Sequence, residues 1–273
     1  MRGRSLAHGD TDVHLRPEGV NVLGVRVDDV TYAEALGILR RAIHDRVPHV
    51  VTTPNPEFVM LARREHGFRA ALGRASLNVP DGIGLLLAAR LAGDRLREHV
   101  QGTDLVLKLA ADSAARHERW FLLGGRGDVA ERAARVLERD FPGLQIAGAT
   151  PGSPLAADDG STRSAIRARG RIDVLLVAYG APKQELWLDR NLAALGVPVG
   201  IGVGGVFDYL SGSVSRAPGW VRRLHFEWCY RLVTQPWRWR RQLALPLFGA
   251  LAFEQAARRR LGPGRRRRQS GWL

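Results

Sequence analysis

The stretch IDVLLVAYGAPKQELWLDRNLAALGVPVGIGVGG, residues 172–205, decides the fold. One apolar run ends at Gly180, Pro182 opens a helical pattern, and a second apolar run ends in the glycines around Gly204. Short apolar runs bounded by turn residues are typical of buried strands, and a helix between two such strands indicates a parallel pair. The stretch therefore predicts a strand, a tight turn, a helix and a second, parallel strand.

The same alternation of strand and helix is repeated along the chain. Apolar runs predict further strands at residues 20–27, 50–53, 76–79, 120–123 and 144–147, and helices are expected at 31–46, 56–72, 83–91, 103–117, 128–140 and 156–169. Such alternation predicts an α/β fold with a doubly wound, mostly parallel, Rossmann-like sheet.

Four regions are expected along the chain. Residues 1–18 are predicted to be a disordered leader, because no apolar segment follows their basic residues. Residues 19–212 are predicted to form the core. Residues 213–261 mix apolar, aromatic and arginine residues, which predicts a helical appendage interrupted at Pro236 and Pro246. Residues 262–273 have the composition of a disordered basic tail.

Positive charge is concentrated at the C-terminal end. Of the net charge of +14, +12 lies from Arg216 onward, where 14 arginines face only Glu227 and Glu254. The same segment holds five of the seven tryptophans. A basic, tryptophan-rich segment predicts an anionic partner, either a membrane surface or a nucleic acid. The longest late apolar run, residues 243–253, is far shorter than the roughly 20 residues that span a bilayer.

Polar side chains follow several of the predicted strands. Thr53 ends one predicted strand and Asn55 follows it, Asp81 follows the next strand, and Gln184 lies in the first turn of the helix after Gly180. Carboxyl ends of parallel strands form a crevice where ligands bind, and glycine turns there let backbone N–H groups approach an anion. This arrangement indicates a phosphate-bearing ligand, although capping of the following helix is an equally good use for Asn55 and is the commoner use of an Asp at the place of Asp81.

Two other types of site are not expected. The pattern Gly125-x-Gly127-x-x-Ala130 matches part of a dinucleotide-binding motif, but no strand ending in Asp or Glu follows about 20 residues later. The single cysteine, Cys229, excludes an internal disulfide, and no group of Cys and His has zinc-ligand spacing. We therefore predict no cofactor and no metal.

With these features together, the sequence resembles the WecG/TagA/CpsF family of bacterial glycosyltransferases, glycosyltransferase family 26. The motifs that carry the resemblance lie in order over about residues 20–253: Thr53-Pro-Asn55-Pro-Glu57, Pro80-Asp81-Gly82-Ile-Gly84, Gly102-Thr-Asp104, Gly180-Ala-Pro-Lys-Gln184-Glu185-x-Trp187, Gly202-Val-Gly-Gly-Val-Phe-Asp208, Ser211-Gly212, Arg216-Ala-Pro-x-Trp220, Glu227-Trp228-x-Tyr230-Arg231-Leu232 and Pro236-x-Arg238.

The resemblance implies an inverting, metal-independent transfer of a sugar from a UDP-sugar to a polyprenyl-pyrophosphate-linked sugar, in the synthesis of a cell-surface polysaccharide. It implies N-acetylmannosamine, its uronic acid or glucose as the donated sugar, and a protein bound peripherally to the cytoplasmic face of the plasma membrane. By the same resemblance Asp81 is the general base. The residues expected to contact substrate are Thr53, Asn55, His99, Asp104, Gly180, Gln184, Gly204, Asp208, Arg216, Arg231, Arg238 and Arg241.

Two positions depart from the family pattern. His99 stands where the family commonly has arginine, and Gln235 stands where glutamate is usual. An alternative function from another class is a nucleic-acid-binding protein, because arginines and aromatic side chains also suit phosphate contact and base stacking. That alternative leaves the motifs of the core unexplained, so nucleic acid is not the expected partner. Self-association through the appendage is a further expectation.

Overall fold

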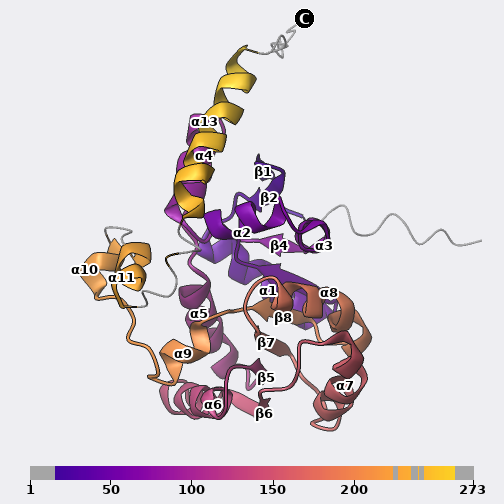
Figure 1. The fold of residues 1–273 in the computed structure, drawn as a ribbon. Coiled ribbons are helices and arrows are strands. Elements are labelled where there is room, and N and C mark those ends of the chain that lie inside the picture. Colours follow the sequence, from indigo (N-terminus) through magenta and orange to yellow (C-terminus); the bar gives the residue numbers. More distant parts are fainter. Residues whose placement is uncertain (1–15, 224–226, 235–238, 240–242, 262–273) are drawn as a thin grey trace, which may run out of the picture.

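A six-stranded parallel sheet forms the centre of the molecule (Figure 1). The computed structural model describes residues 16–223, 227–234, 239 and 243–261. Every neighbouring pair of strands is parallel. In spatial order the strands are β4 (Leu77–Asn78), β3 (His49–Thr52), β8 (Val199–Gly202), β7 (Val174–Ala178), β5 (Arg119–Gly124) and β6 (Gln145–Thr150). The inner strands are apolar and buried, as expected for a sheet covered on both faces.

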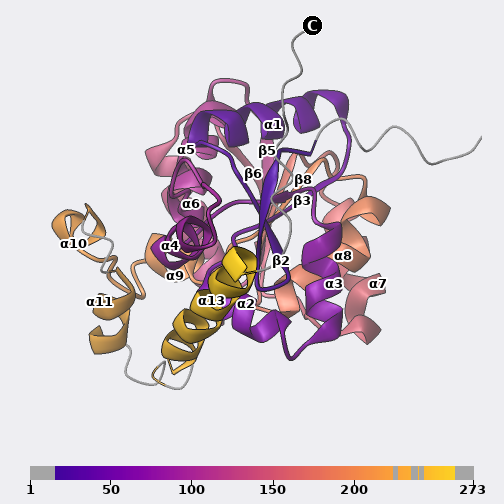
Figure 2. The ribbon, with the colours of Figure 1, turned by 90° about the horizontal axis from the view of Figure 1, so that it is seen from above.

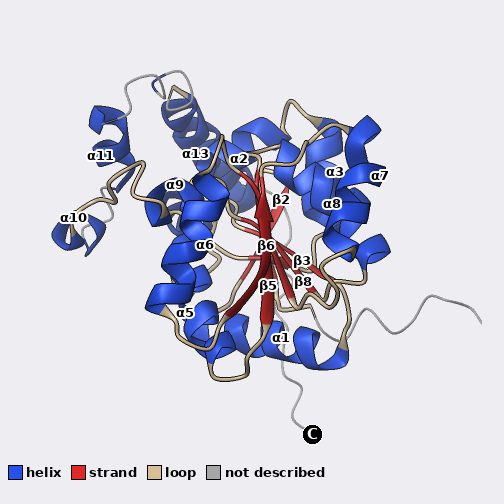
Figure 3. Ribbon diagram, turned by 90° about the horizontal axis from the view of Figure 1, so that it is seen from below, coloured by secondary structure: helices blue, strands red, loops and turns tan. Residues whose placement is uncertain are grey.

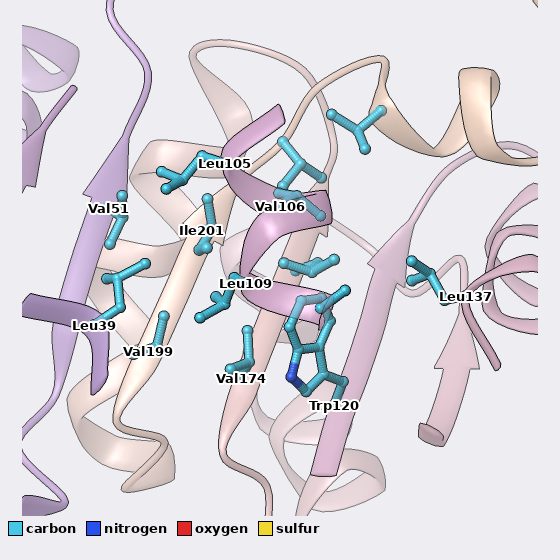
Figure 4. Packing of buried hydrophobic residues seen from close by; sticks show 14 of the residues in the cluster. Leu39, Val51, Leu105, Val106, Leu109, Trp120, Leu137, Val174, Val199 and Ile201 are labelled. Carbon is cyan, nitrogen blue, oxygen red and sulfur yellow. The ribbon is translucent and has the colours of Figure 1, made fainter. Parts of the chain in front are cut away.

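Helices cover both faces of the sheet (Figures 2 and 3). One face carries α1 (Tyr32–Asp45), α5 (Gly102–Ala114), α6 (Val129–Asp140) and α9 (Val206–Leu210), and the other carries α3 (His66–Arg74), α7 (Asp159–Arg167) and α8 (Lys183–Leu195). Trp120, Leu109 and Val174 are fully buried in the core beneath the first group (Figure 4). The predicted doubly wound α/β fold is confirmed.

Two predicted boundaries inside the core are wrong. Residues 20–27 form an antiparallel ribbon outside the main sheet, β1 (Gly19–Val22) and β2 (Val25–Asp28), with a turn at Leu23 and Gly24. The turn is held by Asn21, whose Oδ1 accepts from the N–H of Gly24 at 2.8 Å. The helix expected at 56–72 is divided into α2 (Pro56–Ala62) and α3, because the charged residues 63–65 are exposed and interrupt the apolar face.

The C-terminal part contains α10 (Gly219–Arg223), α11 (Glu227–Thr234) and α13 (Ala244–Leu261). Helix α13 packs along α2 and α4 (Ile83–Leu91), and its residues Phe248, Ala252 and Ala256 are buried (Figure 1). Pro246 does not interrupt this helix, because it is the third residue of α13, where a missing N–H removes no hydrogen bond. Pro236 and the expected leader and tail lie wholly or mostly outside the described residues, and a boundary after residue 212 remains a prediction.

None of the helices in the described ranges is both long enough and apolar enough to cross a bilayer.

Candidate functional site

Turns that follow neighbouring strands meet at the carboxyl edge of the sheet. Thr53 follows β3, Asp81 lies beyond the short β4, Gly180 lies beyond β7 and Gly204 lies beyond β8. Strand β3 is paired with β4 on one side and with β8 on the other, and β8 is paired with β7. Because the strands are parallel, Asp81 lies at the same edge as the two glycine turns, where open α/β sheets bind their ligands.

The Asp81 carboxylate is fixed in direction by its surroundings. Its backbone N–H donates to the carbonyl of Pro54 at 2.9 Å, and its Oδ2 accepts from the N–H of Gly102, the first residue of α5, at 3.2 Å. Nε2 of His99 lies 3.9 Å from Oδ1 of Asp81. The Asp81 side chain is still 31% exposed. A carboxylate that is both oriented and open to solvent can take a proton from a bound hydroxyl group.

Gly102 allows Thr53 and Asp81 to approach the same backbone. A Cβ atom at this position would lie 2.8 Å from Cγ2 of Thr53 and 3.3 Å from Oδ2 of Asp81. The first distance is shorter than van der Waals contact allows, so only glycine fits without movement. Thr53 is itself 8% exposed. The start of α5, Thr53 and Asp81 therefore form one compact group.

Asn55 caps helix α2, as one of its two interpretations predicted. Its Oδ1 accepts from the N–H of Phe58 at 3.0 Å, and Pro56 occupies the first helical position. Gly82, at φ +150°, lies against Asn55. Contact between Asn55 and a substrate remains a prediction.

Tyr32 is a member of this group that the sequence did not indicate. Its hydroxyl oxygen accepts from the N–H of Gln101 at 2.8 Å, one residue before Gly102. Burial, together with the carboxylates of Asp104 and Asp81, raises the pKa of Tyr32 above its usual range, so the hydroxyl stays neutral. Tyr32 thus fixes Gln101, and the N–H of the next residue, Gly102, donates to Asp81. Tyr32 and Gln101 are 69 positions apart, so no local sequence pattern reveals this contact.

Asp104 and Arg216 form an ion pair with each other. Nη1 of Arg216 lies 2.7 Å from Oδ1 of Asp104, and its Nη2 donates to Oε1 of Gln101 at 3.2 Å. The pair ties the chain that enters the C-terminal part to the first turn of α5. Contact of either side chain with substrate stays a prediction.

Gln184 has a structural role that differs from the ligand contact expected of it. It is 1% exposed, and its Oε1 accepts from the N–H of Gly180 and from the N–H of Gly204, both at 3.0 Å. One amide oxygen therefore joins the turn after β7 to the turn after β8. Both glycine N–H groups, which were expected to face an anion, point to Gln184 in this structure.

Glu185 completes the arrangement and was not among the predicted site residues. Its Oε1 accepts from Nε2 of Gln184 at 2.7 Å, and the residue is 1% exposed. Burial raises the pKa of Glu185 to about 7. The sequence did carry a signal, because Glu185 shares one face of α8 with the buried residues Leu188 and Leu192.

We expect Glu185→Gln to remove a pH dependence of stability. Between about pH 4.5 and 7 the folded protein keeps a proton on Glu185 that the unfolded chain has lost, so stability falls as pH rises through this window. The contribution amounts to about 3 kcal/mol at most. Urea unfolding at pH 5 and pH 8 should show that the free energy of unfolding of the variant increases relative to that of the wild type as pH rises.

Exposed Glu138→Gln, on α6, is the matched control for loss of one negative charge. An equal pH effect in both variants would contradict the assignment to Glu185.

The other predicted residues are placed only in part. Asp208 lies in the first turn of α9, directly beyond β8, and its carbonyl accepts from the N–H of Val214 at 3.0 Å. Arg231 belongs to α11, but its side chain is not described. Arg238 and Arg241 lie outside the described residues. Within the described ranges, no three His, Cys, Asp or Glu side chains are grouped as metal ligands.

Comparison with known proteins shows the family of the chain. The family model "Glycosyl transferase WecG/TagA/CpsF family" matches residues 20–262. The chain is 32% identical over 213 residues to the N-acetylglucosaminyldiphosphoundecaprenol N-acetyl-beta-D-mannosaminyltransferase of Bacillus subtilis, covering 78% of this chain and 82% of that protein. It is 35% identical over 198 residues to the enzyme of the same name from Bacillus spizizenii, covering 72% and 76%.

A relative of the same name from Staphylococcus aureus is 27% identical over 231 residues, which cover 84% of this chain and 90% of that protein. The family match spans nearly the whole described structure, including the turns that carry Thr53, Asp81, Gly180 and Gly204. The chain belongs to the WecG/TagA/CpsF family of glycosyltransferases.

Proposed function

We propose that this protein transfers a sugar, with inversion, from a UDP-sugar to a sugar linked to a polyprenyl diphosphate. The observation that carries the proposal is the Asp81 carboxylate, which is oriented by Gly102 and partly exposed at the carboxyl edge. Inversion requires a base that takes the proton of the acceptor hydroxyl while the anomeric carbon is attacked from the face opposite the leaving UDP. Asp81 is that base.

The names of the relatives favour one donor and one acceptor. Those enzymes are N-acetylmannosaminyltransferases that act on N-acetylglucosaminyldiphosphoundecaprenol. We infer UDP-N-acetylmannosamine as the donor here, ahead of the uronic acid and UDP-glucose, and the corresponding lipid-linked acceptor. The product would enter the synthesis of a cell-surface polysaccharide.

Arginines take the place of a metal in this proposal. The leaving diphosphate needs compensating charge, which guanidinium groups can supply through paired N–H donors. We assign this role to Arg231, Arg238 and Arg241, as the resemblance to the family implies. The same basic segment and its tryptophans would bind the anionic inner face of the plasma membrane, where the acceptor lies.

Purified protein should transfer N-acetylmannosamine from its UDP derivative to a synthetic lipid-diphospho-N-acetylglucosamine. Released UDP and the mass of the product are measured for the three donors, each with and without EDTA, and NMR assigns the anomeric configuration of the product. We expect transfer that EDTA leaves unchanged, with a β-linked product from the α-linked donor.

Absence of UDP release with all three donors would contradict the proposed activity. Retention of the α configuration would contradict inversion, and loss of activity in EDTA that Mg²⁺ restores would contradict metal independence.

A further inference from the structure

Most of the large exposed apolar side chains in the described structure belong to α4 or to the C-terminal part. Only two of the large exposed ones, Val47 and Leu155, belong to other parts of the fold. The remainder lie on α4 or in the C-terminal part: Leu87, Leu91, Trp220, Val233, Trp239, Leu243, Leu247, Phe253 and Leu261. Of these elements, α4 and α13 pack against each other, and exposed apolar side chains on neighbouring helices mark a surface that contacts an apolar partner.

Helix α4 carries an apolar stripe that begins beside Asp81. Ile83, Leu87 and Leu91 are spaced four residues apart, so they lie on one face of the helix. Ile83 is the second residue after Asp81, whereas Leu91 ends the helix. Leu87 and Leu91 are 55% and 42% exposed, although neither has a polar group to place in water. The stripe leads from the candidate base to the far end of α4.

Helix α13 runs beside α4 in the same direction (Figures 1 and 2). Near its start, Phe248 lies against Gly84, with 3.8 Å between its Cε1 and a Cβ built on the glycine. Near its end, Nη2 of Arg260 donates to the carbonyl of Leu91 at 3.2 Å, and Arg259 pairs with Asp94. The two helices are therefore joined at both ends.

An apolar groove of about 250 Å³ lies between the C-terminal ends of these helices. Its walls are almost wholly apolar, although Arg260 is one of the residues that line it. The lining residues are Leu91, Phe253, Ala256, Ala257, Arg260 and Leu261. The stripe on α4 ends in this groove, since Leu91 belongs to both.

The distance from base to groove matches the acceptor of the proposed function. Ile83 and Leu91 are eight residues apart, which is about 12 Å along a helix. Between the attacking oxygen of a sugar and the first lipid carbon there are about ten covalent bonds, which span roughly 10–12 Å. An acceptor that extends along α4 from a hydroxyl group at Asp81 therefore brings the start of its lipid to the level of Leu91.

We propose that the groove between α4 and α13 binds the first isoprene units of the acceptor's polyprenyl chain. This inference rests on the proposed function. The arginines Arg258, Arg259 and Arg260 at the end of α13 fit the location, because they would meet phospholipid phosphates at the surface from which the chain emerges. The occupant is the acceptor's own chain, since the groove begins at Leu91, about one sugar diphosphate's length along α4 from the start of the helix beside Asp81.

The test compares two acceptors that differ only in the lipid. Sugar diphosphates that carry a geranylgeranyl chain or an ethyl group are assayed with Leu91→Glu and Phe253→Glu, at positions that solvent already reaches. For both variants we expect KM for the geranylgeranyl acceptor to rise about tenfold or more, because a carboxylate in the groove excludes an apolar chain. KM for the ethyl acceptor and for the donor should stay within about twofold.

Leu247→Glu is the matched control, because Leu247 is exposed on α13, as Phe253 is, but does not line the groove. Equal chain-length preference in the wild type and both groove variants would overturn the proposal. A rise in KM for the geranylgeranyl acceptor in Leu247→Glu as large as in the groove variants would also overturn it. The same holds if the control and the groove variants lose binding to phosphatidylglycerol vesicles without acceptor to the same extent. Either result indicates a general membrane contact.

A second measurement does not depend on turnover. A geranylgeranyl diphospho-sugar with a diazirine near its first isoprene unit should label peptides from α4 or α13, and an excess of unlabelled acceptor should suppress this labelling. Labelling elsewhere would overturn the groove assignment. Failure of the wild type to transfer sugar to either acceptor contradicts the proposed function instead, so the two failures are distinguishable.

Discussion

Asp81→Asn is expected to lower kcat by about 10²- to 10⁴-fold, the usual contribution of a general base. The amide oxygen can still accept the hydrogen bond from the N–H of Gly102, so the local backbone should be retained. An amide cannot take the proton of the acceptor hydroxyl, and the chemical step is therefore lost. Turnover of the lipid-linked acceptor at saturating donor is the measurement.

Measuring the binding of UDP distinguishes loss of the general base from misfolding of the variant. The Kd of UDP, measured by titration calorimetry, should change by no more than about twofold in Asp81→Asn. Asp45→Asn is the control for charge, because Asp45 is exposed and ends α1 just before β3, at the amino edge of the sheet. Turnover within about twofold of the wild type in Asp81→Asn would remove Asp81 from the role of base.

Gly124→Ala is expected to destabilise the fold by about 3–5 kcal/mol. Gly124 ends β5 at φ +108°, a conformation that side chains with a Cβ atom rarely adopt. The added Cβ would lie 2.7–3.0 Å from the carbonyl carbon, oxygen and nitrogen of Ala178 in β7. Because those atoms are backbone at the centre of the sheet, neither strand can move aside easily. Urea unfolding measures the loss.

Gly127→Ala separates the clash from the backbone conformation. Gly127 lies in the same turn at φ +56°, but a Cβ there would meet no atom within 4 Å. This variant should lose only about 1–2 kcal/mol. Equal losses in the two variants would show that contact with Ala178 is not the cause.

The central sheet was predictable because its signals are local. Each inner strand is an apolar run that stops at a glycine or a polar turn, as Val174–Ala178 stops before Gly180. The prediction of one strand at residues 20–27 was wrong for a reason that is also visible in the sequence. Val20, Val22, Val25 and Val27 break the period of two between Val22 and Val25, and this break is the turn.

The site was less predictable, because its decisive contacts join distant segments. The position of Asp81 follows from its strand, but its orientation depends on Gly102 and Tyr32, which lie on α5 and at the start of α1. Gln184 was expected to meet a ligand because it opens a helix at the carboxyl edge. In the folded protein its oxygen points inward to two glycine N–H groups, which come from turns that the sequence does not show to be neighbours.

Because Oε1 of Gln184 accepts from the N–H groups of both glycine turns, ligand binding at one turn is linked thermodynamically to ligand binding at the other. An anion that binds the N–H of Gly180 must displace the Gln184 oxygen, and the same displacement releases the N–H of Gly204. The free energy that a ligand group uses to displace the Gln184 oxygen from the first turn is therefore not required again at the second turn. Occupancy of the two turns is therefore cooperative, and each turn must favour the other's ligand to the same degree.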